Sequence, residues 1–367
     1  MNRLLWQLKR MDWIMTSLVL LLVCLGMLAI YSTSSNVNGS PDVIFSKQLV
    51  FAGVGLLGFF AASLINYRFY RSFSLPLYVI GGILLVVVLL FGTKIHGTTG
   101  WVFIGNYGFQ PVEFVKLFAI IMLARYFSRH GQEFDRLGTL VRSFLIIGIY
   151  LVLILSEPDL GSAIIYLIIW LGLIFFVNVK RSLVVIMIAG IIAAGSAGWL
   201  FVMKDYQKER ITNLFMPNKD SLSTGYNIHQ SIVAVGSGGF WGRGLGLGPQ
   251  SQLKFLPEQQ TDFIFAVIAE EMGFIGVGLT LGIFAVLFFR ILYHARKSRD
   301  DYSIFLIGGV IIMIYTQVFI NVGMNLGIAP VIGVPLPFVS AGGSSLITSL
   351  IAIGMIQSAI INRPKTI

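Results

Sequence analysis

Charged residues are scarce in this sequence. Asp, Glu, Lys and Arg make up 11% of the 367 residues, whereas 56% are hydrophobic, and the mean hydropathy is +0.85. A soluble domain carries about 25% charged residues, so this chain has too few polar side chains to cover a surface in water. The scarcity of charge excludes a soluble globular protein and predicts a polytopic membrane protein.

Cysteine and acidic residues are scarce as well. The single cysteine, Cys24, falls within an apolar run, which excludes a disulfide framework. Only 16 acidic residues stand against 26 Lys and Arg, so the formal net charge is +10 and the pI about 9.7. The basic residues lie between apolar runs rather than in one stripe, which favours membrane topology and anionic lipid headgroups over nucleic acid. The four histidines are scattered without metal-ligand spacing, so no protein-built zinc site is expected.

Long apolar runs are abundant. A bilayer core about 30 Å thick needs about 20 apolar residues in a helix. Runs of about this kind fall at residues 13–34, 47–65, 75–92, 110–127, 142–156, 160–177, 182–203, 262–289, 303–325 and 341–361. The sequence therefore predicts an all-α integral membrane protein, a single polytopic domain over residues 1–367 with about ten transmembrane helices.

The distribution of Lys and Arg predicts the orientation of these helices. Ten spans place both termini on one side of the membrane. With the N-terminus inside, most Lys and Arg fall in inside segments, and the short outside loops hold only Lys47 and Lys94. Because cytoplasmic loops carry an excess of Lys and Arg, we expect both termini in the cytoplasm and the protein in the cytoplasmic (inner) membrane.

One extracytoplasmic loop, residues 204–261 between the seventh and eighth spans, is long, polar and rich in glycine. A loop of this length in a compact protein is usually functional or disordered. Its segment "YNIHQSIVAVGSGGFWG" is typical of a short amphipathic helix followed by a glycine turn. We expect this segment to pack on the membrane surface.

The stretch "LPEQQTDFIFAVIAEEMGFIGVGL", from residue 256, concentrates acidic residues. It holds Glu258, Asp262, Glu270 and Glu271, a quarter of all the acids, at the mouth of an apolar span. Thr261 is the expected N-cap and Asp262 the expected first-turn residue, where an acid complements the helix dipole by about 0.3–1 kcal/mol. Glu270 and Glu271 lie about two and a half turns deeper, so the helix is expected to line something polar, with Glu258 at its mouth. Asp262, at the outer boundary, is then placed to accept a proton from a substrate hydroxyl.

A second charged pair lies in the segment "QPVEFVKLF". Pro111 suits the first helical turn, and Glu113 and Lys116 follow three residues apart on one helix face. One interpretation is a self-neutralising pair that stabilises the helix. The other is the floor of a polar cavity, with Lys116 available to an anionic substrate, and the cost of charge at membrane depth favours this second interpretation.

The long loop also holds candidate binders of anionic groups. Arg210, Arg243 and Lys254 are the natural candidates, although incidental loop charge is the simpler interpretation of any single one. The glycines of "GSGGFWGRGLGLG" lack the Gly-Lys-Ser/Thr ending of a phosphate loop, and no strand precedes them. Tight turns or close backbone approach explain these glycines better.

The segment "IAPVIGVPLPFVSAGGSSLI" contains three prolines, which cannot continue a helix, so an ordered re-entrant or extended loop is expected before the last span. Ser340, Gly342, Gly343 and Ser344 stand where that span begins. The free N–H groups of a helix start could bind a phosphate. Small residues for close helix packing are an equally weighted alternative.

The chain resembles the SEDS family (shape, elongation, division and sporulation proteins), the RodA/FtsW peptidoglycan polymerases, over essentially its whole length. The most specific match is "NVGMNLGIAPVIGVPLPFVSAGGSS"; "GFQPVEFVKL", "EPDLGSA" and "TDFIFAVIAEEMGFIG" also match family blocks in order. The short N-terminus and cytoplasmic ends resemble RodA more than FtsW. The family's usual Arg-Trp is Gly100-Trp101 here, and its "QPDLG" is "EPDLG" with Glu157.

The resemblance implies a glycosyltransferase that polymerises lipid II at the outer face of the cytoplasmic membrane, supporting cell elongation and rod shape. The family's essential aspartate falls on Asp262, its tryptophan on Trp101, and its Glu/Lys pair on Glu113 and Lys116. Asp262 would take the proton of the acceptor sugar's 4-hydroxyl, and undecaprenyl diphosphate would leave with inversion. Lys116, Arg210 and a bound Mg²⁺ or Mn²⁺ are candidates for stabilising its charge, and no organic cofactor is expected.

The resemblance also implies a partner, a class B penicillin-binding protein that crosslinks the product, with its single helix docked on the ninth and neighbouring spans. Three other functions are open to the sequence. A lipid II flippase would use the same acids as a translocation path, but the cytoplasmic halves of the spans show little polar route. A proton-coupled transporter commonly shows inverted repeats, and none is evident. A scaffold that only holds a partner is partly compatible with the polymerase.

Overall fold

The structure is a computed structural model that describes residues 3–34, 43–95, 98–134, 136–177, 179–204, 207–208, 212, 224–253 and 255–363. Arg210 and Lys254 lie outside the described residues. Within the described part, helices dominate, and eight of them are long and apolar enough to cross a membrane. The prediction of an all-α, multi-helix membrane protein is confirmed.

The eight candidate spans follow the apolar runs of the sequence. They are α2 (Trp13–Ser34), α3 (Val43–Leu64), α5 (Ser74–Phe91), α7 (Leu137–Ser156), α9 (Arg181–Ala197, extended by the π-helical turn Gly198–Val202), α13 (Ile264–Arg296), α14 (Asp301–Asn325) and α15 (Gly343–Ile361). Two further predicted spans correspond to α6 (Pro111–His130), which carries Glu113 and Lys116, and to the shorter apolar α8 (Leu160–Ile174).

Short elements connect these helices. They are α1 (Arg3–Lys9), α4 (Tyr67–Ser72), the 3-10 turn Gly131–Glu133, α11 (Thr224–Ser237) and α12 (Pro249–Gln252). A small antiparallel sheet, which the sequence did not predict, lies between α5 and α6 and has the strand order β1 (Thr93–Ile95), β2 (Thr98–Ile104), β3 (Tyr107–Phe109). The predicted amphipathic helix followed by a glycine turn is confirmed as α11 and the turn after it.

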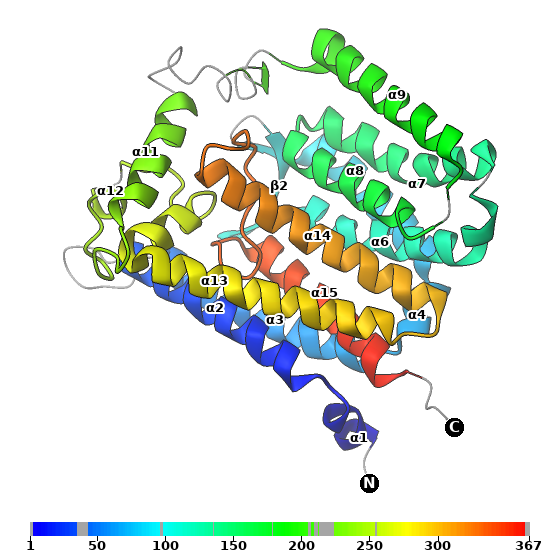
Figure 1. Ribbon diagram of the computed structural model, residues 1–367, viewed down its shortest axis with the longest axis horizontal. Coiled ribbons are helices and arrows are strands. Elements are labelled where there is room, and N and C mark those ends of the chain that lie inside the picture. The colour runs from blue at the N-terminus through cyan, green and yellow to red at the C-terminus, as the bar shows by residue number, and fades with distance from the viewer. Residues whose placement is uncertain are drawn as a thin grey trace.

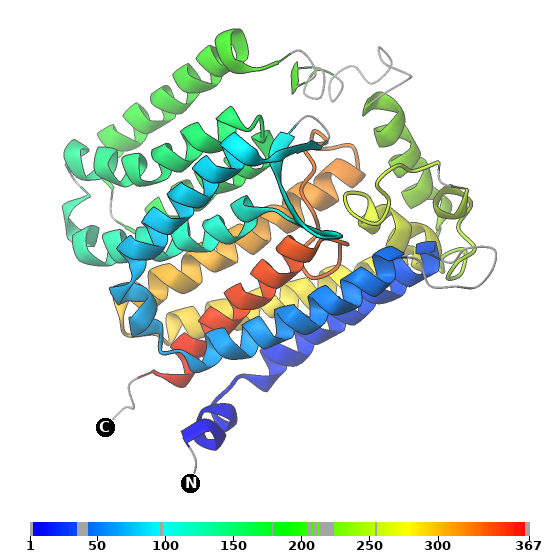
Figure 2. The same ribbon diagram turned by 180° about the vertical axis from the view of Figure 1, so that it is seen from behind.

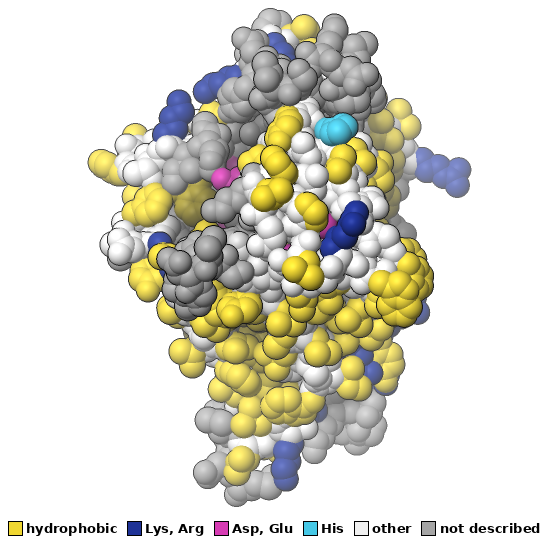
Figure 3. Space-filling view, turned by 90° about the vertical axis from the view of Figure 1, so that its left-hand side faces the viewer, with side chains coloured by type: hydrophobic (Ala, Val, Ile, Leu, Met, Phe, Trp, Pro, Cys, Tyr) yellow, Lys and Arg dark blue, Asp and Glu magenta, His cyan; other side chains and the backbone are white. Residues whose placement is uncertain are grey.

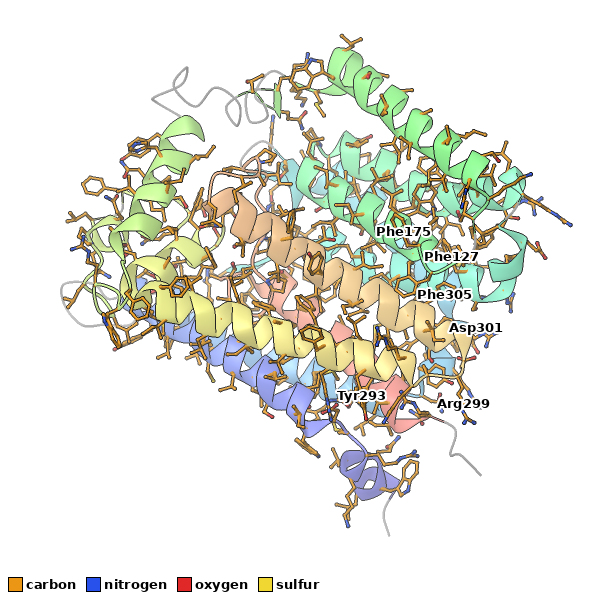
Figure 4. All side chains as sticks on the ribbon, in the orientation of Figure 1. Phe127, Phe175, Tyr293, Arg299, Asp301 and Phe305 are labelled. Atoms are coloured by element: carbon orange, nitrogen blue, oxygen red, sulfur yellow. The ribbon has the colours of Figure 1, made fainter. Side chains whose placement is uncertain are left out.

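The long helices run side by side, and both termini lie at one end of the bundle (Figures 1 and 2). We call this end the termini end; the opposite, loop end carries the small sheet, α11, α12 and the loop between α14 and α15. Of the eight candidate spans, α14 and α15 are the most buried, because 78% and 83% of the residues in their apolar windows are buried. α15 packs along α3, and α14 packs against α6 and α8. In Figure 4, Phe127 of α6 and Phe305 of α14 lie together, with ring centroids 5.5 Å apart.

A polar cluster joins three helices at the termini end. Asp12, just before α2, is buried and accepts hydrogen bonds from Arg290 Nε, at 2.6 Å, and from His294, both near the end of α13. Its backbone N–H donates to Gln357 Oε1 of α15 at 2.9 Å, and Gln357 Nε2 donates to the Asp12 carbonyl at 2.8 Å. Burial alone would raise the pKa of Asp12, but the His294 and Arg290 bonds outweigh it and hold that pKa well below its usual range.

The start of α13 differs from the prediction. The predicted N-cap at Thr261 and first-turn position of Asp262 are wrong, because both residues lie in a turn and the helix begins at Ile264. The helix also continues to Arg296 and is interrupted at Gly273, where φ is 63° and ψ is −160°. Asp262 therefore lies before the helix, and its backbone carbonyl bonds to α14 rather than within α13.

Candidate active site

The backbone of Asp262 is held by two asparagines of α14. Its carbonyl oxygen accepts from Asn321 Nδ2 and Asn325 Nδ2, each at 3.0 Å. Both asparagines are fully buried, and Asn325 Oδ1 also accepts from the N–H of Ala266 at 3.1 Å. Asn325 therefore binds both the carbonyl before α13 and an unpaired N–H of its first turn, which fixes the start of the helix.

The two residues before Asp262 are held in the same way by the segment before α15. The Thr261 carbonyl accepts from Ser340 Oγ at 2.6 Å, and the Gln260 carbonyl accepts from the Ala341 N–H at 2.8 Å. Gln48 of α3 holds that segment in turn, because its Nε2 donates to the Ser340 carbonyl at 3.2 Å. Three successive carbonyls are thus anchored by α14 and by the loop before α15.

The Asp262 side chain is only half-buried, although its backbone is fixed. Its Oδ2 lies 3.5 Å from the position that a Cβ would take at Gly333, in the loop between α14 and α15. Gly333 has a φ of +70°, a conformation that side chains disfavour. This glycine gives the loop a close backbone approach to the carboxylate.

The other acids of this stretch have different environments. Glu258 is exposed, with a φ of 51°, and its Oε2 accepts from Thr261 Oγ1 at 3.0 Å. Glu270 and Glu271 are 0% and 2% exposed. The Glu270 carboxylate accepts from the N–H groups of α12, and Ser251 Oγ lies 3.5 Å from Glu271 Oε1. The Glu270 carboxylate therefore faces the backbone of α12, and a cavity lined by Glu270 and Glu271 stays a prediction.

Glu113 and Lys116 form a closed pair in α6. Lys116 Nζ lies 2.6 Å from Glu113 Oε1, with Lys116 0% and Glu113 5% exposed. Glu113 Oε2 is buried and has no hydrogen-bond partner. This arrangement matches the self-neutralising pair, and a role of Lys116 toward an anionic substrate stays a prediction.

The small residues at the start of α15 make packing contacts. A Cβ at Gly343 would lie 2.5 Å from the Phe51 ring of α3, so only glycine allows this close packing. Ser344 Oγ accepts from the Gln110 N–H at 2.8 Å and joins the starts of α6 and α15. The Gly342 N–H donates to Gln48 Oε1 at 3.1 Å. These contacts support the packing alternative, and phosphate binding at this helix start stays a prediction.

Trp101 lies on the small sheet, half-buried on β2, and its ring packs on Gly108 of β3. The sheet contacts the turn after α7, where the Thr99 N–H donates to the Glu157 carbonyl at 3.4 Å. Burial, and secondarily the Asp159 carboxylate, raise the pKa of Glu157 to about 7. Glu157 is thus close to half protonated at neutral pH.

Arg243 is the remaining candidate binder of anionic groups among the described residues, and it is exposed in the loop before α12. Within the part of the chain that the structure describes, no three His, Cys, Asp or Glu side chains gather as a metal site. A groove of about 650 Å³ lies between α5 and α7, but apolar residues such as Val79 and Val152 line it, and Asp262 does not.

Asn321, Asn325 and Gln48, whose side chains hold the Asp262 turn, were not predicted as site residues from the sequence. A signal was present, because Asn321 and Asn325 lie four residues apart on one face of an apolar span, and buried amides in spans usually bind another helix. The partner of such a pair is not readable from the sequence. It lies 59 and 63 residues earlier in the chain.

The fold and this site define a multi-pass membrane protein with a carboxylate mounted on a backbone turn at the loop end. The FtsW/RodA/SpoVE cell cycle protein model matches residues 12–364, nearly the whole chain. The chain belongs to this family, the SEDS family.

Relatives of known name share most of the chain. The peptidoglycan glycosyltransferase MrdB of Escherichia coli is 35% identical over 353 residues, covering 96% of this chain and 94% of the relative. Stage V sporulation protein E of Bacillus subtilis is 37% identical, with 94% and 95% covered.

Two solved structures are also similar. One chain of a peptidoglycan synthase complex, studied for the coordination of polymerization and crosslinking, has a TM-score of 0.82 at 30% identity, with 95% and 97% covered. The rod shape determining protein RodA of Thermus thermophilus has a TM-score of 0.70 at 27% identity, with 97% and 98% covered.

Proposed function

We propose that this protein is a peptidoglycan glycosyltransferase that polymerises lipid II into glycan strands. The main observation in favour of this function is the way the backbone at Asp262 is held. Three successive carbonyls are anchored by buried side chains and backbone, while the carboxylate itself remains half-buried. A rigid backbone with an accessible carboxylate is the arrangement that a general base needs.

In the proposed reaction, Asp262 takes the proton of the acceptor sugar's 4-hydroxyl. The hydroxyl oxygen forms a bond to the anomeric carbon of the donor, and the bond from that carbon to the diphosphate breaks. Undecaprenyl diphosphate leaves with the electron pair, and the anomeric configuration inverts. A diphosphate is a good leaving group without protonation, so one carboxylate suffices, unlike the acid/base pair of glycoside hydrolases.

Positive charge is needed where the diphosphate leaves. Arg243 is exposed near the loop end, and Arg210 and Lys254 belong to the same long loop. Lys116 would reach a substrate only if its pair with Glu113 opened. Mg²⁺ is commonly held by one or two carboxylates together with substrate phosphates. A divalent cation bound in this way would need only Asp262 or Glu258 from the protein.

The proposed orientation places both termini in the cytoplasm and the loop end outside. The excess of Lys and Arg in the segments at the termini end supports this topology. The acceptor and donor tails would then lie in the bilayer with their sugars at the outer interface, near Asp262.

The proposed physiological role is cell elongation and rod shape, with a class B penicillin-binding protein as the partner that crosslinks the product. The similarity to a chain of a peptidoglycan synthase complex supports such a partner. We expect its helix to dock on α14, which exposes Tyr315 and Phe319 on its surface.

Product sizing tests the proposal. Purified protein in detergent, with and without partner and divalent cation, is incubated with lipid II, and the products are separated by length. Strands longer than one disaccharide support the polymerase. Movement of lipid II across vesicle membranes without any strand formation would replace it with the flippase.

A further inference from the structure

The break in α13 is covered by the loop that precedes α12. We call residues 238–248 the glycine strap. At Gly273 the backbone leaves helical geometry, and backbone groups on both sides of it bond to the strap. The Glu270 and Glu271 carbonyls accept from the N–H groups of Arg243 and Gly244 at 2.9 and 3.0 Å.

The strap also serves the other side of the break. The N–H of Phe274 donates to the Gly239 carbonyl at 2.9 Å, and the N–H of Ile275 donates to the Phe240 carbonyl at 3.3 Å. Backbone groups on both sides of the interruption are thus paired with the strap. Unpaired backbone is costly in an apolar environment, so the break depends on these four bonds.

Glycine is required for so close an approach. A Cβ at Gly242, where φ is +84°, would lie 2.2 Å from the Glu271 carbonyl oxygen. A Cβ at Gly238 would lie 1.9 Å from the Ala269 carbonyl oxygen. Two backbones therefore touch here without side chains between them, which is the physical reason for this part of the glycine-rich motif.

Glu270 attaches the loop a second time. Its Oε1 accepts from the Gln250 N–H at 2.8 Å and its Oε2 from the Ser251 N–H at 3.0 Å, at the start of α12. This carboxylate is fully buried, so it is committed to the protein backbone. The loop is bound to α13 through both backbone and side chain.

The break divides α13 into two different elements. Residues 264–271 are all buried. Beyond the break, large apolar side chains are exposed on the surface of the bundle, with exposed fractions of 66% for Phe274, 51% for Leu279 and 74% for Phe289. Residues 274–296 alone would extend roughly 34 Å at 1.5 Å per residue, enough for a bilayer core of about 30 Å. Residues 264–272, which we call the leading segment, are thus a separate short helix enclosed by protein.

We propose that the glycine strap and Glu270 position Asp262 by fixing the far end of the leading segment. The proposal rests on the proposed function, because Asp262 is its general base. One end of the leading segment is held by Asn321 and Asn325, and the other by the strap. A short helix fixed at both ends cannot tilt, so the Asp262 turn keeps its place. Gly242 and Glu270 are positioning residues, since neither touches the reacting atoms.

The test uses the full-length protein in nanodiscs with the variant Gly242→Ala. The added methyl group forces the strap away from the break. Because misplacement by about 1 Å can cost up to 10²-fold, we expect kcat to fall about 10- to 100-fold with KM nearly unchanged. Hydrogen exchange, read by mass spectrometry, should rise in the strap and also in the peptide that covers residues 259–267.

Two controls separate this effect from general damage. Gly278→Ala lies on the same helix beyond the break, where an added Cβ meets nothing within 4 Å. Gly105→Ala imposes the same strain at a φ of +60°, also in open space. Both should keep wild-type kcat and wild-type exchange at residues 259–267. If Gly242→Ala fails to fold, Glu270→Gln, which retains one acceptor oxygen, should lower kcat in the same direction by a smaller factor.

Each result decides the proposal. A wild-type kcat in Gly242→Ala overturns it, and so does a loss of activity without faster exchange at residues 259–267. A rise in KM alone also overturns it, because positioning acts on the chemical step. An inactive wild-type protein would remove the proposed function instead, and the exchange measurement would still show whether the strap controls the Asp262 turn.

The strap also borders an apolar surface. Figure 3 shows hydrophobic side chains over the face that carries α11 and α12. Trp241 of the strap is 79% exposed and Phe240 stacks on Phe274, with ring centroids 5.8 Å apart. The exposed apolar side chains of the strap are therefore continuous with those of α13 beyond the break.

Discussion

Asp262 is fixed through its backbone, and its side chain is left half-buried. A base that must accept a proton benefits from this division, because the hydrogen bonds to its backbone carbonyl fix its position while the side chain is not fully enclosed. The neighbouring acids Glu270 and Glu271 are at the other extreme, since both are buried. The four acids of this stretch, from Glu258 to Glu271, therefore have different environments although they are close together in the sequence.

Glu157 is the residue at which pH dependence is expected. Its pKa rises from an ordinary 4.5 to about 7 on folding, so the folded protein binds the proton more tightly than the unfolded chain. Stability therefore decreases as pH rises from about 4.5 to 7, by on the order of 3 kcal/mol in total. Glu157→Gln, which stays neutral, should flatten this part of the pH profile of thermal unfolding and unfold at higher temperature at pH 8. An unchanged pH profile in the variant would contradict the assignment.

The same residue explains a departure from the family pattern. The family block has Gln where this chain has Glu157, and a buried carboxyl that is largely protonated below pH 7 resembles the amide in charge and shape. Below pH 7 the substitution therefore preserves a largely neutral side chain of the same shape beside the small sheet.

At the element scale, the helices are joined at both ends by polar contacts. Asp12 ties α2 to α13 and α15 at the termini end, and the asparagines of α14 tie the start of α13 at the loop end. These polar contacts fix how the helices are positioned along one another, which apolar surfaces alone specify only weakly.

Asp12→Asn tests the termini-end cluster. The variant leaves Arg290 and His294 without their buried counter-charge, so we expect the unfolding free energy to fall by about 3 kcal/mol. The stabilisation is present at neutral pH and is lost as pH falls below the ordinary Asp value of 3.8, because the pKa of Asp12 is lowered on folding. Thermal unfolding in detergent at pH 7 measures the loss. The exposed Asp301→Asn, at the start of α14, is the matched control and should unfold like wild type.

The positions of the helices were easier to predict from the sequence than the contacts between them. The helices follow apolar runs, because length and hydropathy are local properties of the sequence. The break of α13 was not predictable, because the apolar run continues through Gly273 and the replacing hydrogen bonds come from residues 239–244. Close backbone approach was expected for the glycines and is confirmed at Gly238 and Gly242, but the surface approached was unknown.

The sequence pointed to Asp262 as a candidate base, but it did not predict the side chains that hold the Asp262 turn. Asp262 was identified from its position at the mouth of a span, whereas the hydrogen bonds to its carbonyl come from residues 321 and 325. Pairings between distant segments depend on the folded arrangement of the helices, which no local pattern encodes. Ser340 and Ser344 were identified as site residues, and the structure gives both of them contacts within the protein.

At the scale of the whole molecule, the protein is a bundle whose loop end carries every candidate residue of the reaction that the structure describes. The termini end holds the fixed cluster around Asp12. A reaction at one membrane face, with lipid tails entering from the side, suits such a polarised molecule.

Metal removal tests how the leaving diphosphate is stabilised. If a divalent cation is held by substrate phosphates and one or two carboxylates, EDTA should reduce glycan-strand formation at least about tenfold, and Mg²⁺ or Mn²⁺ should restore it. The unfolding temperature without substrate should not change, because no three-ligand cluster exists among the described residues. Full activity in EDTA would mean that Arg and Lys side chains alone stabilise the negative charge of the leaving diphosphate.

The most direct test of Asp262 as the general base is strand formation from lipid II by Asp262→Asn, compared with wild type and with Asp301→Asn. Removing a general base costs about 10²- to 10⁴-fold, so we expect loss of nearly all polymerisation at an unchanged unfolding temperature, with Asp301→Asn fully active. Strand formation by Asp262→Asn at a rate close to that of wild type would show that Asp262 is not the base.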